Sequence, residues 1–215
     1  MKTLLQKELR LALHPTAPLF LCLSAMLLIP NYPYCVVFFY TSLAVFFICL
    51  TGRENHDVFY SVLLPIGKAD VVKARFATVI LLELLQVALA VPFAVLRQRL
   101  ITAPNEAGME ANTALFGIAF LLLGLFNLVF FGLYYRDVQK VGKSFGLSCA
   151  VTFVCICLVE TFSHILPFFR DQLDTRDPLY LPQKLLVLAV GIVLFCLLTG
   201  LAYHRAKRDF QAQDL

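Results

Sequence analysis

Long apolar stretches separated by short polar segments make up almost the whole chain. Residues 11–52 contain no Asp, Glu, Lys or Arg, and the segment Pro30-Asn31-Tyr32-Pro33 divides them because proline ends a helix. A membrane-spanning helix needs about 20 residues, so this region is long enough for two spans. Four further apolar stretches follow. We therefore expect six spans, at approximately 16–30, 34–52, 72–96, 112–135, 144–166 and 184–204.

The composition agrees with this pattern. Of the 215 residues, 60% are hydrophobic and 15% are charged, and the mean hydropathy is +0.80. A soluble domain has about 25% charged residues and needs a polar surface, so this excess of apolar side chains does not fit one water-soluble core. A soluble enzyme and a nucleic-acid-binding module are excluded. The predicted fold class is an all-α integral membrane protein with a single transmembrane domain over residues 1–215.

The basic residues predict the orientation of the six spans. The termini and the loops at 53–75 and 136–143 contain 13 of the 18 bases, whereas the other loops contain five, namely Arg97, Arg99, Arg170, Arg176 and Lys184. Since basic residues concentrate on the cytoplasmic side, we expect both termini in the cytoplasm.

Motifs for catalysis, nucleotide binding and metal binding are not indicated. Gly142-Lys143-Ser144 looks like the end of a phosphate-binding loop, but Asp137 stands where that motif needs its first glycine. The four histidines are scattered singly, and the seven cysteines form no CxxC pair. We expect no catalytic residue, cofactor or metal site in this chain. Gly142, Gly146 and Ala150 instead predict close helix packing, within the chain or across a dimer.

Two acidic residues lie within predicted spans. Glu83 falls in the third span and Glu160 in the outer half of the fifth. A carboxylate in hydrocarbon is costly and normally faces a helix interface or a hydrated cavity. These acids, with Gln86 and Asn127, are therefore candidates for the lining of a substrate pathway or for proton transfer. The alternative is that a hydrogen-bonded acid stabilises helix packing.

The N-terminal segment predicts an amphipathic helix over residues 2–13 that lies at the membrane surface. Lys7 and Arg10 fall on its basic face, which suits anionic headgroups. Glu8 falls on the apolar face and therefore needs a basic partner, for which Arg53 and Arg75 are candidates.

The loop at 53–70 predicts a second short helix, over residues 54–64. Its apolar residues recur at helical spacing, although the segment is too short to span a membrane. Such a helix either packs on the protein's own cytoplasmic surface or docks into a groove of a soluble partner.

A charged segment between Pro167 and Pro182 predicts a compact structure on the outer side. It contains Arg170, Asp171, Asp174, Arg176 and Asp177, whose opposite charges suit ion pairing.

These features carry a family resemblance. The surface helix KELRLAL, the early pair of spans, and the loop LLP-x-x-K-x-D-V-V-K-A-R before the third span resemble the permease subunits of type-2 ABC exporters. Within that family the chain is most similar to short bacterial permeases for amphipathic peptides, such as the phenol-soluble modulin exporter. The resemblance implies a bacterial cell membrane protein in which the 2–13 helix is the elbow helix, including Lys7, Glu8 and Arg10.

The resemblance also implies that the 54–64 helix is a coupling helix that contacts a separate ATPase. The residues expected at that contact are Glu54, Asp57, Phe59, Tyr60, Leu63, Leu64, Pro65 and Lys68. ATP and Mg²⁺ would then bind to the partner ATPase, and two permease copies would enclose the substrate pathway. The implied function is export of amphipathic peptides or other amphiphiles. The alternatives are a six-span binding subunit of a vitamin importer and a proton-coupled carrier that uses Glu83 and Glu160.

Overall fold

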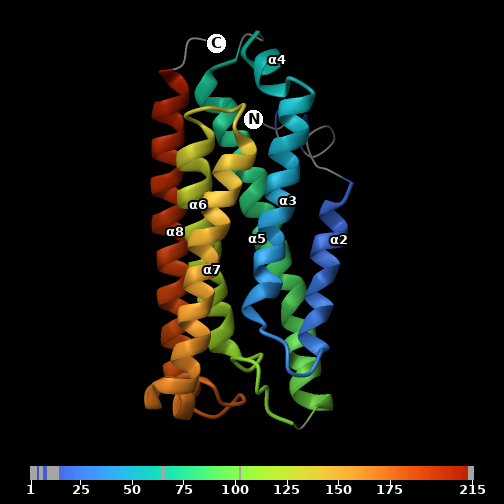
Figure 1. The fold of residues 1–215 in the computed structure, drawn as a ribbon, viewed down its shortest axis with the longest axis vertical. Coiled ribbons are helices and arrows are strands. Elements are labelled where there is room, and N and C mark those ends of the chain that lie inside the picture. The colour runs from blue at the N-terminus through green and yellow to red at the C-terminus, as the bar shows by residue number, and fades with distance from the viewer. Residues whose placement is uncertain (1–3, 5–6, 9–14, 64–65, 102, 213–215) are drawn as a thin grey trace.

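The computed structural model describes residues 4, 7–8, 15–63, 66–101 and 103–212. All regular secondary structure in these residues is helical, and the long helices run up and down in one bundle (Figure 1). In chain order the elements are α2 (Ala17–Cys22), η2 (Leu23–Leu28), α3 (Cys35–Glu54), α4 (Asp57–Leu63), α5 (Lys68–Leu100), α6 (Thr113–Tyr134), α7 (Val141–Ile165), η3 (Phe169–Leu173) and α8 (Leu181–Gln211).

Five of these helices, α3, α5, α6, α7 and α8, are long and apolar enough to cross a membrane. The first of the six expected spans, at 16–30, is not confirmed. There, six α-helical residues continue into six residues of 3₁₀-helix, which together rise only about 21 Å against a hydrocarbon core of about 30 Å. Ile29 then adopts an extended conformation and ends the element.

The long helices extend past the apolar stretches that predicted them. α5 covers Lys68–Leu100 where 72–96 was expected, and α8 covers Leu181–Gln211 where 184–204 was expected. Charged residues at both ends continue the backbone hydrogen-bond pattern of the helix, so hydropathy marks the apolar part of each helix and not its ends.

The expected helix over 54–64 is shorter in the structure. Glu54 is the last residue of α3, and α4 begins at Asp57. The break lies at His56, whose φ of 51° is incompatible with a continuous right-handed helix. The elbow helix expected over 2–13, including Arg10, lies almost wholly outside the described residues, of which Leu4, Lys7 and Glu8 are part.

Helix α6 forms the centre of the bundle and packs against α3, α7 and α8 (Figure 1). Its contact with α8 is close because glycines face each other at the crossing. A Cβ atom added at Gly191 of α8 would overlap the carbonyl group of Gly117 in α6, and one added at Gly117 would lie 2.5 Å from the carbonyl oxygen of Val187. Nearer α4, stacked aromatic rings of α6 fill the core, including Phe126, Phe130 and Tyr134.

Replacement of Gly191 by alanine tests the α6–α8 crossing. Alanine favours a helix by about 1 kcal/mol over glycine, but the added methyl group at this position must separate two backbones. We expect Gly191→Ala to destabilise the protein by about 1–3 kcal/mol in thermal unfolding in detergent. Gly200→Ala is the matched control on the same helix, since a Cβ atom there meets open space. Equal stability of the two variants would contradict the close crossing.

Candidate functional site

A buried ion-pair network joins the N-terminal segment, α4 and α5. At its centre lies Arg75 of α5, whose side chain is 3% exposed. Its Nε atom lies 2.7 Å from Oε2 of Glu8, and its Nη2 atom donates to Oδ2 of Asp57 at 2.8 Å. Nη1 donates to the backbone carbonyl of Ile48 in α3 at 3.3 Å. One guanidinium group therefore connects four segments of the chain.

Lys7 completes this network and balances its charge. Its Nζ atom lies 2.5 Å from Oδ1 of Asp57 and donates to Oγ of Ser61, one turn later in α4. Two bases and two acids are thus paired in one cluster, which we call the Arg75 network: Lys7, Glu8, Asp57 and Arg75. Of the two bases considered for Glu8 from the sequence, Arg75 is the partner, because residue 53 lies at the end of α3 and pairs with Glu54.

Two side chains of α4 that lie outside this network are exposed. Tyr60 is 67% exposed and Leu63 is 81% exposed, at the same end of the bundle as the end of α8 (Figure 1). Glu54 is also exposed, whereas Asp57 belongs to the Arg75 network and Lys68 begins α5. The side chain of Phe59 and the residues Leu64 and Pro65, which were expected at the same contact, lie outside the described part of the chain. The ion pairs of Asp57 therefore hold α4 in place, and the helix exposes one aromatic and one aliphatic side chain.

A second polar group lies in the middle of the bundle. Oε2 of Glu83 in α5 accepts a hydrogen bond from Nδ2 of Asn127 in α6 at 3.0 Å, and the same nitrogen lies 3.3 Å from Oγ1 of Thr199 in α8. Gln86 is fully buried one turn from Glu83, and neither of its amide atoms has a hydrogen-bond partner among the described residues. The structure thus brings Glu83 and Asn127 together as a link between three helices.

Glu160 lies apart from this group, at the end of the bundle opposite α4. Its Oε2 atom accepts from the backbone N–H of Met109, at 3.0 Å. The adjacent residue is Gly108, where a Cβ atom would overlap the carboxylate. Glu160 therefore fixes the loop between α5 and α6 and makes no contact with Glu83.

That loop and the segment before α8 form a compact layer, which we call the cap: residues 103–112 and 169–180. Basic side chains bind its backbone carbonyl groups. Lys184 is fully buried and donates to the carbonyl of Thr175 at 2.6 Å and to Oδ1 of Asp177 at 3.1 Å, and Arg176 donates to the carbonyls of Ile101 and Ala103. Of the ion pairs expected within the outer segment, Arg170 pairs with Asp171. Asp177 instead pairs with Lys184 of α8, and Arg176 donates to backbone carbonyl groups.

Several of these residues carried no signal in the sequence. Arg97 and Lys184 were counted as outer bases, yet both are fully buried, and Arg97 donates to the Tyr34 hydroxyl at 2.7 Å. The sequence does not mark Thr199 or Ser61 as site residues, because hydroxyl residues are common in helices. Among the described residues, no group of three His, Cys, Asp or Glu side chains is placed to hold a metal ion.

The fold and these sites define a multi-pass helical membrane protein whose polar groups connect helices. The family model of the ABC-2 family transporter proteins matches residues 3–206, and the chain belongs to this family. The matched residues are the membrane-embedded permease part of such a transporter. No curated protein and no solved structure matches the chain significantly.

Removal of Arg75 tests the network. Arg75→Gln leaves the carboxylates of Glu8 and Asp57 without their shared partner, so we expect a loss of about 3–5 kcal/mol in the free energy of unfolding. Arg136→Gln is the control, because Arg136 pairs with Asp209 at an exposed site and such pairs contribute about 0–1 kcal/mol. A second Glu8→Gln change should recover part of the loss. The network would be refuted if both arginine variants unfolded alike.

The cap should respond to pH through Asp174. Burial raises the pKa of this carboxyl group to about 7, although the hydrogen bond from the Glu110 N–H acts to lower it. The pKa of an aspartate in the unfolded chain is about 3.9. The folded protein therefore retains a proton that the unfolded chain releases. The stability from this group is complete below about pH 4 and is lost as the pH rises to about 7.

Asp174→Asn keeps an oxygen acceptor for the Glu110 N–H but cannot ionise. We expect the variant to melt a few degrees above the wild type at about pH 8, and both to melt alike at about pH 4, since about 1 kcal/mol shifts Tm by about 2–4 °C in a chain of this size. Differential scanning calorimetry in detergent reports unfolding at both pH values. A difference in Tm that does not change with pH would exclude Asp174 as the titrating group.

Proposed function

We propose that this permease is the membrane half of an ATP-driven exporter, and that α4 is the helix through which a separate ATPase moves it. The observation that carries the proposal is the two-sided environment of α4. Tyr60 and Leu63 are exposed for a partner, and Asp57 ties the other side of the helix to Arg75 and Lys7. A displacement of α4 would thus reach α5 and the N-terminal segment directly.

The orientation that this requires is supported by the charge distribution. The sequence predicts 13 of the 18 bases on one side of the membrane. Among the described residues, Lys68, Lys73, Lys140, Lys143 and Arg205 lie at the bundle end with α4. Cytoplasmic segments of membrane proteins carry such an excess of bases. We assign the α4 end to the cytoplasm, where ATP and an ATPase subunit are available, and the cap to the outer side.

The proposed working unit contains two permeases and two ATPase chains. Helix α7 offers a surface for the second copy, since a Cβ atom at Gly142 or Gly146 would meet open space and Ala150, one turn further, is exposed. Of the two interpretations of these small residues, packing within the chain therefore receives no support. Small residues spaced by four positions allow close approach of two membrane helices.

The proposed substrates are amphipathic peptides or other amphiphiles, which would pass between the two permease copies. This assignment rests on the similarity of the N-terminal helix and the 63–75 loop to peptide-exporter permeases. A proton relay through Glu83 and Glu160 receives less support, because Glu83 pairs with Asn127 whereas Glu160 is bound to the cap.

Leu63→Arg tests the docking surface. Leu63 is exposed and makes no contribution to the Arg75 network, so the variant should fold and insert normally. The tagged permease is co-expressed with the ABC ATPases of its own organism and purified. We expect at least about tenfold less ATPase to remain bound to Leu63→Arg than to the wild type. The reason is that a charge in the core of an interface costs about 1.4 kcal/mol or more. Leu179→Arg is the matched control, an exposed leucine in the cap. Equal retention by both variants would exclude α4 as the docking helix.

A further inference from the structure

A long groove separates α5 from α8 on the side of α6 that faces away from α7. It consists of two cavities of about 600 Å³ and about 810 Å³. Both cavities are lined by Phe120 of α6 and Ile192 of α8, so they adjoin each other along this groove. Each has the size of a site for a small molecule, for which about 300–1,000 Å³ is usual.

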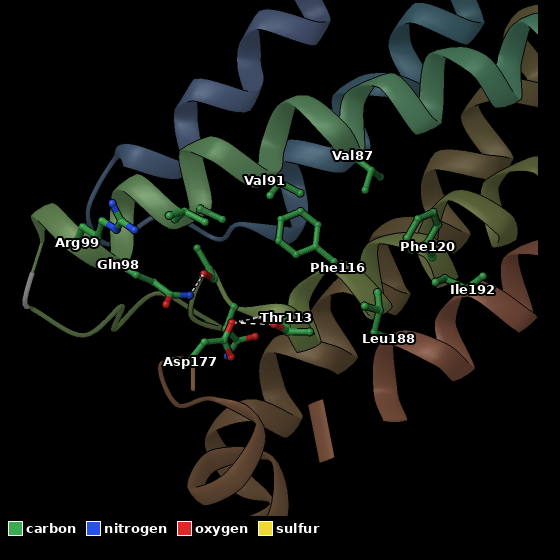
Figure 2. Close-up of a pocket in the computed structure, with 14 residues that line it drawn as sticks. Val87, Val91, Gln98, Arg99, Thr113, Phe116, Phe120, Asp177, Leu188 and Ile192 are labelled. Carbon is green, nitrogen blue, oxygen red and sulfur yellow. Dashed lines mark hydrogen bonds between the residues drawn. The ribbon is translucent and has the colours of Figure 1, made fainter. Parts of the chain in front are cut away.

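The interior of the groove is apolar. In the first cavity, Val87 and Val91 of α5 face Leu188 and Ile192 of α8, and Phe116 and Phe120 lie between them (Figure 2). Val91 and Ile192 are exposed at the depth of the membrane spans. The groove is therefore open toward the hydrocarbon of the bilayer, and molecules that enter it come from the membrane.

The mouth of the first cavity is polar and carries one unbalanced positive charge. Gln98, Arg99, Thr113 and Asp177 lie together at one end, whereas Phe120 and Ile192 lie at the other (Figure 2). Asp177 is already neutralised, since Oδ1 pairs with Lys184 at 3.1 Å and Oδ2 accepts from the N–H and the hydroxyl of Thr113. Arg99 is exposed and forms no ion pair with any residue of the described chain.

The second cavity ends at another such base. Lys73 lines it, is exposed, and likewise has no ion pair within the part of the chain described. Along α5, Lys73 and Arg99 are about 39 Å apart at a rise of about 1.5 Å per residue. A bilayer measures about 40–45 Å including its headgroups. The two bases therefore lie at headgroup depth in opposite leaflets, with apolar walls between them.

We propose that this groove is a binding site for phospholipids with an anionic headgroup. The phosphate group pairs with Arg99 at the mouth of the first cavity, and an acyl chain lies between α5 and α8 against Phe116 and Phe120. Arginine suits this role because its guanidinium group binds phosphate through two parallel hydrogen bonds. An anionic lipid is favoured because Arg99 neutralises its net charge, whereas the phosphate of a zwitterionic lipid already has a cation in its own headgroup. The site lies on the opposite side of α6 from the α7 surface, so it does not depend on the proposed dimer or on the identity of the exported substrate.

The absence of tryptophan from the chain allows a direct test. Leu188→Trp places a fluorescent reporter inside the groove, and Leu186→Trp places one on the same helix at a site that is 66% exposed. Each variant is reconstituted into phosphatidylcholine vesicles that contain a small fraction of lipid with brominated chains, as phosphatidylglycerol or as phosphatidylcholine. Bromine quenches tryptophan only on contact.

We expect brominated phosphatidylglycerol to quench Leu188→Trp at least about threefold more efficiently than brominated phosphatidylcholine, and both lipids to quench Leu186→Trp alike. In the Leu188→Trp background, Arg99→Gln should abolish the preference and Arg99→Lys should keep most of it. Equal quenching of Leu188→Trp by both lipids would mean bulk lipid contact and would overturn the proposal. No quenching by either lipid would mean that protein, such as a second copy, fills the groove, and would overturn it as well.

A second measurement uses chains without a tryptophan reporter, so its result does not depend on correct folding of Leu188→Trp. Phospholipid that remains after purification in mild detergent is extracted and counted per chain, for the wild type and for Arg99→Gln. We expect less phosphatidylglycerol on the variant and an unchanged amount of zwitterionic lipid. Equal amounts of phosphatidylglycerol on the two chains would contradict the role of Arg99.

Discussion

The buried guanidinium group of Arg75 is the constraint on which the α4 end of this permease depends. A charge at 3% exposure is stable only where its partners are fixed, and its partners come from the N-terminal segment, α3 and α4. Each of these segments is therefore held in place by the other two. The pairing also fixes how α4 is turned: Asp57 faces Arg75, while Tyr60 and Leu63 lie outside the network and remain exposed. The same ion pairs thus fix the helix and define its exposed surface.

At the other end, basic side chains organise the cap in a different way. Lys184, Arg97 and Arg176 bind mainly backbone carbonyl groups of irregular segments, which have no helix to satisfy them. The cap is consequently held together with little regular secondary structure, while the helices between the two ends meet through small residues and a few polar contacts such as Glu83 with Asn127. Polar networks thus hold the bundle together at both ends, and the cavities between α5 and α8 leave room for membrane lipids.

The sequence predicts the parts of this structure that hydrophobicity controls. The five long spans follow from apolar stretches of sufficient length, and the need of Glu8 for a base follows from its position on an apolar helix face. The choice of Arg75 over Arg53 could not be predicted, because it depends on how α3, α4 and α5 meet in space. The burial of Lys184 and Arg97 was missed for a related reason, since carbonyl groups of distant loops neutralise them. The shortened first helix reflects a local change to 3₁₀ geometry that apolar composition does not encode.

Site-specific photo-crosslinking in the membrane tests most directly whether α4 is the contact for an ATPase. A photoreactive amino acid replaces Leu63 in α4 or, for comparison, Leu179 in the cap, both of which are exposed. We expect light to link the permease to an ABC ATPase from position 63 and not from position 179. A permease that forms no such product from position 63, or forms it equally from both positions, would contradict the assignment of α4 as the docking helix.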